Sequence, residues 1–187
     1  MLKTLILSLS LMLISSNAMA EMKLMTIAGG CFWCMQPVFE SEEGVKKVTA
    51  GYGGGTSANP NYENIGDHYE LAQVEYDPAK IGYEELLKVY FYNIDAFDAG
   101  GQFYDRGHQY QTVIFYHDDE QKKLAEKVKA ELEKQKGKKI ATQILPYKNF
   151  YPAEDYHQDY YKKNPERFEA YHEGSGRDEK LKAIWAK

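Results

Sequence analysis

Short stretches rich in apolar and β-branched residues recur along the chain and predict a series of β-strands. The segment KLMTIA is typical of a buried strand and is broken by Gly29 and Gly30. The segment VKKVTAGY alternates between apolar and polar positions, and glycines follow it. The predicted strands are 23–28, 45–52, 71–77, 110–116 and 138–145.

Helices are predicted between some of these strands from a helical spacing of apolar residues. Residues 83–94 place apolar side chains three and four positions apart, as on one face of an amphipathic helix. These side chains are Tyr83, Leu86, Leu87, Tyr90, Phe91 and Ile94. Residues 118–135 form a highly charged helix with a thin apolar stripe, which Asp118 or Asp119 caps and Gly137 ends.

The order of these elements predicts the fold class. A further helix begins at Cys31 and runs toward Glu40, and short helices with many aromatic residues follow Pro152. The order β-α-β-β-α-β, followed by α-β, predicts an α+β fold with a two-layer, ferredoxin-like split βαβ core. Additional helices and a loop-rich C-terminal segment would surround it. We find no internal repeat or long linker, and therefore predict a single domain over residues 21–187.

Residues 1–20 are excluded from this domain because they have the pattern of a secretory signal peptide. A positive charge precedes an apolar run from Leu5 to about Ile14, and an A-x-A cleavage pattern ends at Ala20. An uncleaved anchor helix is the alternative, but the run is shorter than the ~20 residues that span a bilayer. We predict cleavage after Ala20, a periplasmic or secreted protein, and no stable association with the membrane afterwards.

Composition narrows the choice of partners. The chain has 187 residues, of which 43% are hydrophobic and 27% are charged, and its formal net charge is −5. An acidic chain without a basic stripe argues against nucleic acid or an anionic membrane as its partner. Tyrosine is unusually frequent, with sixteen copies, and most of these rings are expected to pack while the hydroxyl reaches water. We expect the protein to be a monomer.

The only two cysteines, Cys31 and Cys34, stand in the segment GGCFWC. A zinc site is one interpretation, but this pair supplies two of four ligands and the histidines show no paired spacing. A structural disulfide is another, although so short a loop constrains the unfolded chain little. The remaining interpretations are a thiol–disulfide exchange motif and a catalytic nucleophile beside a resolving cysteine.

The position of the cysteines supports redox chemistry. Cys31 follows a predicted strand and a Gly-Gly turn, and stands at a helix N-terminus, where the helix dipole favours a thiolate. Cys34 is one turn further on the same face and can attack an oxidised form of Cys31. The large aromatics between them, Phe32 and Trp33, could pack in the core or form an apolar pocket beside the thiol.

The segment GGCFWCMQPVFE resembles the active site of the peptide methionine sulfoxide reductase A family, whose signature is Gly-Cys-Phe-Trp. Four other segments match that family in the same order: GYGGGTSANPNYENI, DHYELAQVEYDP, YDRGHQYQTVIFY and NFYPAEDYHQDYY. The resemblance covers roughly residues 23–172. Matches in register along the chain are more specific than a single four-residue motif.

The resemblance implies roles for the residues at these positions. Cys31 would attack the sulfoxide sulfur, and Glu70 would protonate the sulfoxide oxygen, which requires a carboxyl with a raised pKa. Tyr62 and Tyr110 match the tyrosines that hydrogen-bond this oxygen, and Asp105 matches a polar residue of the pocket.

The same resemblance implies the substrate contacts and the redox cycle. Phe32 and Trp33 match the aromatics that receive the methyl group of the substrate. Reduction would leave Cys31 as a sulfenic acid, with which Cys34 condenses to a disulfide. A thioredoxin-like donor would reduce this disulfide, and no metal or other cofactor is implied. The expected substrates are S epimers of methionine sulfoxide, free or in oxidised exported proteins.

Several positions depart from the family pattern or allow simpler interpretations. The loop before Glu70 is short, Asp67 replaces a glycine, and His108 stands where threonine is frequent. Without the resemblance, Glu70 would be interpreted as a solvated carboxylate and Tyr62 as a loop anchor. His68 and the histidine in EDYHQ match structural positions of the family.

Two other functions stay open at this point. An exported thioredoxin-like oxidoreductase would share the C-x-x-C motif, but its tryptophan usually precedes the first cysteine. A methionine- or peptide-binding module would carry inert cysteines with an ordinary thiol pKa.

Overall fold

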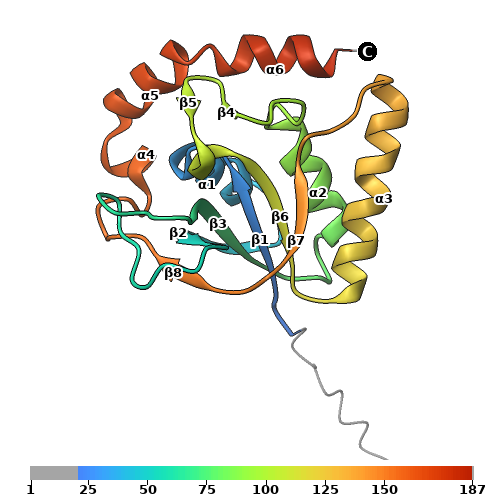
Figure 1. Ribbon diagram of the computed structural model, residues 1–187, viewed down its shortest axis with the longest axis horizontal. Coiled ribbons are helices and arrows are strands. Elements are labelled where there is room, and N and C mark those ends of the chain that lie inside the picture. The colour runs from blue at the N-terminus through green and yellow to red at the C-terminus, as the bar shows by residue number, and fades with distance from the viewer. Residues whose placement is uncertain (1–20, 187) are drawn as a thin grey trace, which may run out of the picture.

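A single mixed sheet of six strands organises the described part of the chain (Figure 1). The computed structural model describes residues 21–186, and the predicted signal peptide lies outside the described residues. The strands are β1 (Lys23–Gly29), β2 (Val45–Gly53), β3 (Tyr69–Tyr76), β6 (Thr112–Tyr116), β7 (Gln143–Pro146) and β8 (Phe150–Pro152). Their order in the sheet is β7-β6-β1-β3-β2-β8.

The four central strands confirm the predicted ferredoxin-like core. β3 lies between β1 and β2 and is antiparallel to both, while β6 is antiparallel to β1. The first crossover is helix α1 (Phe32–Glu40), and helix α2 (Tyr83–Tyr92) joins β3 to the segment before β6. β7 extends the sheet parallel to β6, and β8 extends it antiparallel to β2.

The helices α1, α2 and α3 (Asp119–Lys136) pack on one face of this sheet. Alternation along β1 directs Met25 and Ile27 toward that face, where the apolar stripes of α2 and α3 cover them. As predicted, Asp118 caps α3 by accepting a hydrogen bond from the Gln121 backbone N–H at 2.8 Å. Burying these stripes is the main source of stability for helices of this length.

The opposite face of the sheet is smaller and is covered by the chain between β7 and β8. Leu71, Val113 and Phe115 form its core, with Tyr147 and Phe150 packed against them. Because Leu71 points to this face, its neighbour Glu70 must point to the face that carries α1. The register of β3 therefore determines on which side of the sheet the candidate acid lies.

Two predicted strands begin later than the sequence indicates. The strand predicted over 138–145 begins only at Gln143, because the preceding residues bond elsewhere. The Ala141 backbone N–H donates to the Ala96 carbonyl at 2.7 Å, outside the sheet ladder. Similarly, β6 begins at Thr112, and residues 108–110 form a 3₁₀ turn, η1 (His108–Tyr110). This turn moves Tyr110 out of the sheet.

Smaller elements complete the described chain. A two-stranded hairpin is formed by β4 (Gly101–Gln102) and β5 (Asp105–Arg106). The C-terminal helices are α4 (Tyr160–Lys163), α5 (Pro165–Gly174) and α6 (Arg177–Trp185). In Figure 1, α5 and α6 run along one end of the sheet, beside the hairpin. Among residues 21–186, no helix is both long and apolar enough to cross a bilayer.

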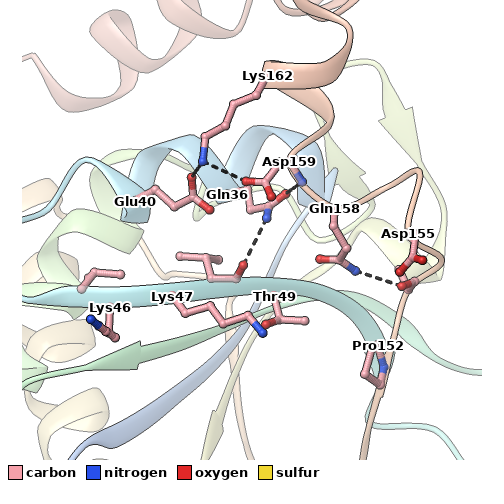
Figure 2. Close-up of a pocket in the computed structure, with 13 residues that line it drawn as sticks. Gln36, Glu40, Lys46, Lys47, Thr49, Pro152, Asp155, Gln158, Asp159 and Lys162 are labelled. Atoms are coloured by element: carbon pink, nitrogen blue, oxygen red, sulfur yellow. Dashed lines mark hydrogen bonds and ion pairs between the residues drawn. The ribbon is translucent and has the colours of Figure 1, made fainter.

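The C-terminal segment is tied to α1 and β2 by polar side chains (Figure 2). The Lys162 ammonium lies 2.6 Å from the Glu40 carboxylate of α1 and 2.9 Å from that of Asp159. Gln36 of α1 donates to a carbonyl of β2 and accepts from the Asp159 backbone N–H. A cavity of about 640 Å³ lies among these groups, but neither cysteine lines it. These contacts hold the start of α4 against α1.

Candidate active site

Cys31 is the residue that caps the N-terminus of α1. The chain turns sharply after β1 at Gly30, whose φ of +80° favours glycine; a Cβ there would also lie 2.6 Å from that of Gln102. Cys34 follows one turn later, and its backbone N–H donates to the Cys31 carbonyl at 3.1 Å. Both thiols are free and buried. The spacing allows a disulfide after a modest adjustment of the first turn.

Glu70 faces the same helix terminus from β3. Its Oε2 accepts a hydrogen bond of 3.0 Å from the Phe32 backbone N–H, and only 3% of the residue is exposed. Burial raises the pKa of the Glu70 carboxyl well above its ordinary value, and the nearby Cys31 adds to this rise. Glu70 can therefore keep a proton at a pH where an exposed glutamate has lost it.

The two thiols have opposite pKa shifts. The sequence predicts that the helix terminus favours a thiolate at Cys31, but burial raises the pKa of this thiol. A hydrogen bond from Cys31 lowers the pKa of Cys34, and the positive charge of Arg177 lowers it further, although burial opposes both. Cys31 is thus stored as a thiol, and any nucleophilic role requires a base that takes its proton.

One small cavity brings together most of the residues singled out from the sequence. It has a volume of about 80 Å³ and is lined by Cys31, Phe32, Trp33, Tyr62, Glu70, Asp105, Tyr110 and Tyr171. This volume suits a group of a few atoms rather than a drug-sized ligand. Cys34 does not line the cavity. Of the lining residues, only Tyr171 has no counterpart in the sequence predictions.

Aromatic rings form one side of this cavity. The Trp33 indole stacks on Tyr160 of α4 at 3.8 Å between ring centroids, and its Nε1 donates to His157 Nδ1 at 3.0 Å. Burial lowers the pKa of His157, which keeps its ring neutral and able to accept this bond. Phe32 is almost fully buried against His157 and Tyr52. Both rings are therefore held in one orientation.

Hydroxyl and carboxyl groups form the polar side of the cavity. Tyr110 comes from η1 and Tyr62 from the loop between β2 and β3. Partial burial raises the pKa of both phenols, so each remains a hydrogen-bond donor at neutral pH. Asp105 on β5 accepts a hydrogen bond from the Tyr171 hydroxyl, and burial raises the pKa of its carboxyl. A buried thiol thus shares a small space with a proton donor and several hydroxyls.

Comparison with known proteins shows to which family the chain belongs. A sequence model described as peptide methionine sulfoxide reductase matches residues 23–187. The chain belongs to this family. A similar protein is the peptide methionine sulfoxide reductase MsrA 2 of Staphylococcus aureus strain MW2, which is 51% identical over 166 residues. The match covers 86% of this chain and 94% of the relative.

Solved structures of similar proteins share the fold. The reduced form of Mxr1 from Saccharomyces cerevisiae has a TM-score of 0.73 at 35% identity. That comparison covers 77% of this chain and 86% of Mxr1. Mxr1 in complex with Trx2 has a TM-score of 0.52 at 32% identity, covering 74% of this chain and 84% of that one.

Asp67 and His108, which depart from the reductase pattern, form hydrogen bonds that close the loop before Glu70. The Asp67 carboxylate accepts four hydrogen bonds from the backbone N–H groups and hydroxyls of Thr56 and Ser57. These bonds lower the pKa of Asp67. The His108 Nε2 contacts the Asp67 carbonyl at 3.0 Å, and His68 bonds to the same loop through both ring nitrogens. The short loop is therefore closed by side chains.

Tyr171 is the residue of this cavity that the sequence analysis did not predict. It lies on α5, between Asp105, to which its hydroxyl donates, and Trp33, whose ring it meets edge-on at 6.2 Å. Its position among sixteen tyrosines carried no signal, because the last of the matching segments, NFYPAEDYHQDYY, ends at Tyr161. Within residues 21–186, no group of three or more His, Cys, Asp or Glu side chains is placed to hold a metal ion.

Proposed function

We propose that this chain reduces methionine S-sulfoxide to methionine, with Cys31 as the nucleophile and Glu70 as the acid. Membership of the reductase family supports the reaction class. The observation that carries the assignment of residues is the cavity itself. It combines a buried thiol, a buried carboxyl with a raised pKa, and tyrosine hydroxyls in a volume that suits a methylsulfinyl group.

The first step transfers oxygen from the substrate to Cys31. Protonated Glu70 gives its proton to the sulfoxide oxygen, and the carboxylate formed in this way accepts the Cys31 thiol proton as the Cys31 sulfur attacks the sulfoxide sulfur. Tyr62 and Tyr110 donate hydrogen bonds to the sulfoxide oxygen during this transfer. The S–O bond of the substrate breaks, and the oxygen remains on Cys31 as a sulfenic acid. Methionine gains two electrons, and Cys31 loses them.

The aromatic rings orient the substrate for this step. Phe32 and Trp33 would receive the methyl group, because a methyl on a polarised sulfur packs well against an aromatic face. The stacking of Trp33 on Tyr160 and its bond to His157 keep that ring in place before the substrate arrives. Little conformational entropy then has to be lost on binding.

The second step regenerates the enzyme through Cys34. Cys34 attacks the sulfenic sulfur of Cys31, water leaves, and a disulfide forms between residues one helical turn apart. A thioredoxin-like dithiol then reduces this disulfide. The solved complex of the related Mxr1 with Trx2 supports this type of donor. Because one chain carries both cysteines, we propose that the monomer is the active form.

Tyr171→Phe should lower kcat/KM roughly ten- to a hundredfold, since hydrogen bonds to charged groups contribute about 1.5–3 kcal/mol. Loss of the hydroxyl leaves Asp105 without its donor and raises the pKa of that carboxyl further. Steady-state kinetics on a blocked methionine sulfoxide measures the effect. Tyr161→Phe is a matched control, because that hydroxyl also donates to a carboxylate, on Glu40, outside the cavity. Equal losses in both variants would contradict a specific role for Tyr171.

We further propose that the protein is exported and repairs oxidised proteins outside the cytoplasm. The support is the charge, apolar run and A-x-A pattern of residues 1–20. Expression of the full chain in a bacterium, followed by N-terminal sequencing of the exported fraction, should identify Glu21 as the first residue. Replacing Ala20 by a bulky residue should leave the precursor uncut. A full-length chain that stays in the cytoplasm would contradict this proposal.

Separate S and R epimers of a blocked methionine sulfoxide test the function directly. With dithiothreitol as reductant, residues 21–187 should convert the S epimer and leave the R epimer unchanged. Chiral chromatography of the products measures both. Turnover of neither epimer, with reduction of insulin disulfides instead, would overturn the proposed function in favour of thiol–disulfide exchange.

A further inference from the structure

Arg177 is a buried cation beside the two cysteines. Only 5% of the residue is exposed, although arginine is almost always at the surface. Its position depends on a local turn: Gly176 has a φ of +64°, and Ser175 Oγ accepts from the Arg177 backbone N–H at 3.2 Å. This turn, in the segment GSGR, directs the side chain inward at the start of α6.

The contacts of the Arg177 guanidinium surround the cysteine-bearing turn. Nη2 lies 3.4 Å from the Gly29 carbonyl, just before the turn, and 3.9 Å from the Met35 sulfur, next to Cys34. The guanidinium carbon lies 4.7 Å above the Phe103 ring, in the loop that leads to Asp105. The C-terminal helix thus places a positive charge against α1.

This cation has no carboxylate at ion-pair distance among residues 21–186. Its contacts are a neutral carbonyl, a thioether and an aromatic ring, which stabilise a charge less than a direct ion pair does. Burying a charge without a close counter-ion costs several kcal/mol in general. A group that becomes negative during the reaction would offset that cost.

Asp105 and Cys34 are acidic groups whose pKa the charge of Arg177 lowers, and Cys34 is the one of the two that becomes negative in order to attack. The ionisable groups that act on it are Cys31 on its own helix, Glu70 on β3, Asp105 on β5 and Arg177 on α6. Of these, Arg177 alone carries a positive charge, and it lowers the pKa of Cys34 while both carboxylates raise it. Cys31 is almost equally buried, and the main influences on its pKa are burial, Cys34, Tyr171 and Asp105.

We propose that Arg177 is a positioning residue for the second step, which holds Cys34 as the attacking thiolate beside oxidised Cys31. This inference rests on the proposed function, because that function supplies the sulfenic acid. The Cys34 sulfur attacks the sulfenic sulfur of Cys31, the S–S bond forms, and the S–O bond breaks. The hydroxide leaves as water with a proton from Glu70, and the sulfenic acid is reduced while Cys34 is oxidised.

A single-turnover experiment without reductant separates the two steps. Residues 21–187 are mixed with methionine S-sulfoxide and quenched with acid at successive times. Chromatography counts the methionine formed, and intact mass distinguishes the sulfenic acid from the disulfide. In Arg177→Met, one methionine per chain should still form, while the disulfide forms about three- to tenfold more slowly. Without the Arg177 charge, a smaller fraction of Cys34 is ionised, which slows the attack. Because the pKa of Cys34 is then higher, the thiolate that does form is more nucleophilic, and this partly offsets the loss.

The pH dependence gives a readout that a merely structural role would not move. The rate of disulfide formation should shift to higher pH in Arg177→Met and should return toward that of the unsubstituted chain in Arg177→Lys. The matched control is Lys180→Met, which removes an exposed cation of the same helix that also lies over Phe103. A rate and pH profile in Arg177→Met that equal those of the control would overturn the inference.

A second measurement needs no change at Arg177. Absorbance of the thiolate near 240 nm titrates the remaining cysteine in Cys31→Ala and in Cys34→Ala. Cys34, left alone, should ionise at a lower pH than Cys31 left alone, although the two are equally buried. The reverse order would overturn the inference. If the unsubstituted chain forms no methionine at all, the proposed function is wrong. That outcome differs from failure of the Arg177 inference alone, in which methionine still forms.

Discussion

Replacing Cys31 by serine is expected to abolish methionine formation, with a loss of activity on the order of a thousandfold or more. Serine has almost the same shape, but its hydroxyl is a far weaker nucleophile than a thiolate and cannot accept the sulfoxide oxygen as a sulfenic acid. The fold should be retained, because Cys31 acts as the N-cap residue and serine is favoured there. Methionine release from the S epimer, measured with dithiothreitol, checks this result.

Cys34→Ser is the matched variant, because it removes the other thiol of the same turn. It should form about one methionine per chain and then stall when the reductant is of the thioredoxin type. Dithiothreitol, which is small enough to reach a sulfenic acid, should restore part of the turnover. Full turnover of Cys34→Ser with thioredoxin would contradict the resolving role, and full turnover of Cys31→Ser would contradict the proposed mechanism as a whole.

Glu70→Gln is expected to lower kcat/KM about a hundred- to ten-thousandfold, which is the usual contribution of general acid catalysis. Glutamine keeps the shape and can still accept the Phe32 hydrogen bond through its oxygen, but it has no acidic proton to deliver. Glu75→Gln is a suitable control, because Glu75 lies on the same strand and, by the alternation of β3, on the opposite face. Similar losses in both variants would indicate a structural cause.

The pH dependence of kcat/KM is a second test of Glu70 as the acid. Burial raises the pKa of its carboxyl, so the protonated form persists to a higher pH than for an exposed glutamate. An acid is active below its pKa, so kcat/KM should fall as the pH rises through that raised value. Glu70→Gln should lack this decrease. A profile that is unchanged in Glu70→Gln would show that another group supplies the proton.

Because its pKa is raised, Cys31 rests as a thiol until substrate binds. A thiolate exposed to oxidants would be oxidised without substrate. Burial keeps Cys31 as a thiol, and Glu70 lies in the same cavity, where it can take this proton once it has given its own to a bound sulfoxide. Reactivity would then depend on the presence of substrate.

Much of the architecture follows from local sequence patterns. The buried strand β1, the amphipathic stripe of α2 and the Asp118 cap of α3 are properties of short segments, and the structure contains each of them. The element order then leaves few ways to pair four central strands, and the ferredoxin-like order is observed. The segment at 138–142 was harder to predict, because its polar groups bond outside the sheet.

The residues of the candidate site can be predicted from the sequence, because they occur in short motifs. The sequence by itself placed Cys31 and Cys34 on one helical turn, and named the residues that the fold would have to bring near them. It could not determine that Glu70 is buried, because an alternating strand has two faces and only packing selects which of them α1 covers.

Only the tertiary structure decided the electrostatics of the site. Tyr171 and Arg177 reach the cysteines from helices more than a hundred residues away in sequence, through ties such as Lys162 to Glu40. The direction of each pKa shift depends on burial and on charges that the fold brings close, and neither is a property of a motif. The motifs therefore identify the reacting groups, while their protonation states are determined by how the C-terminal helices pack against α1.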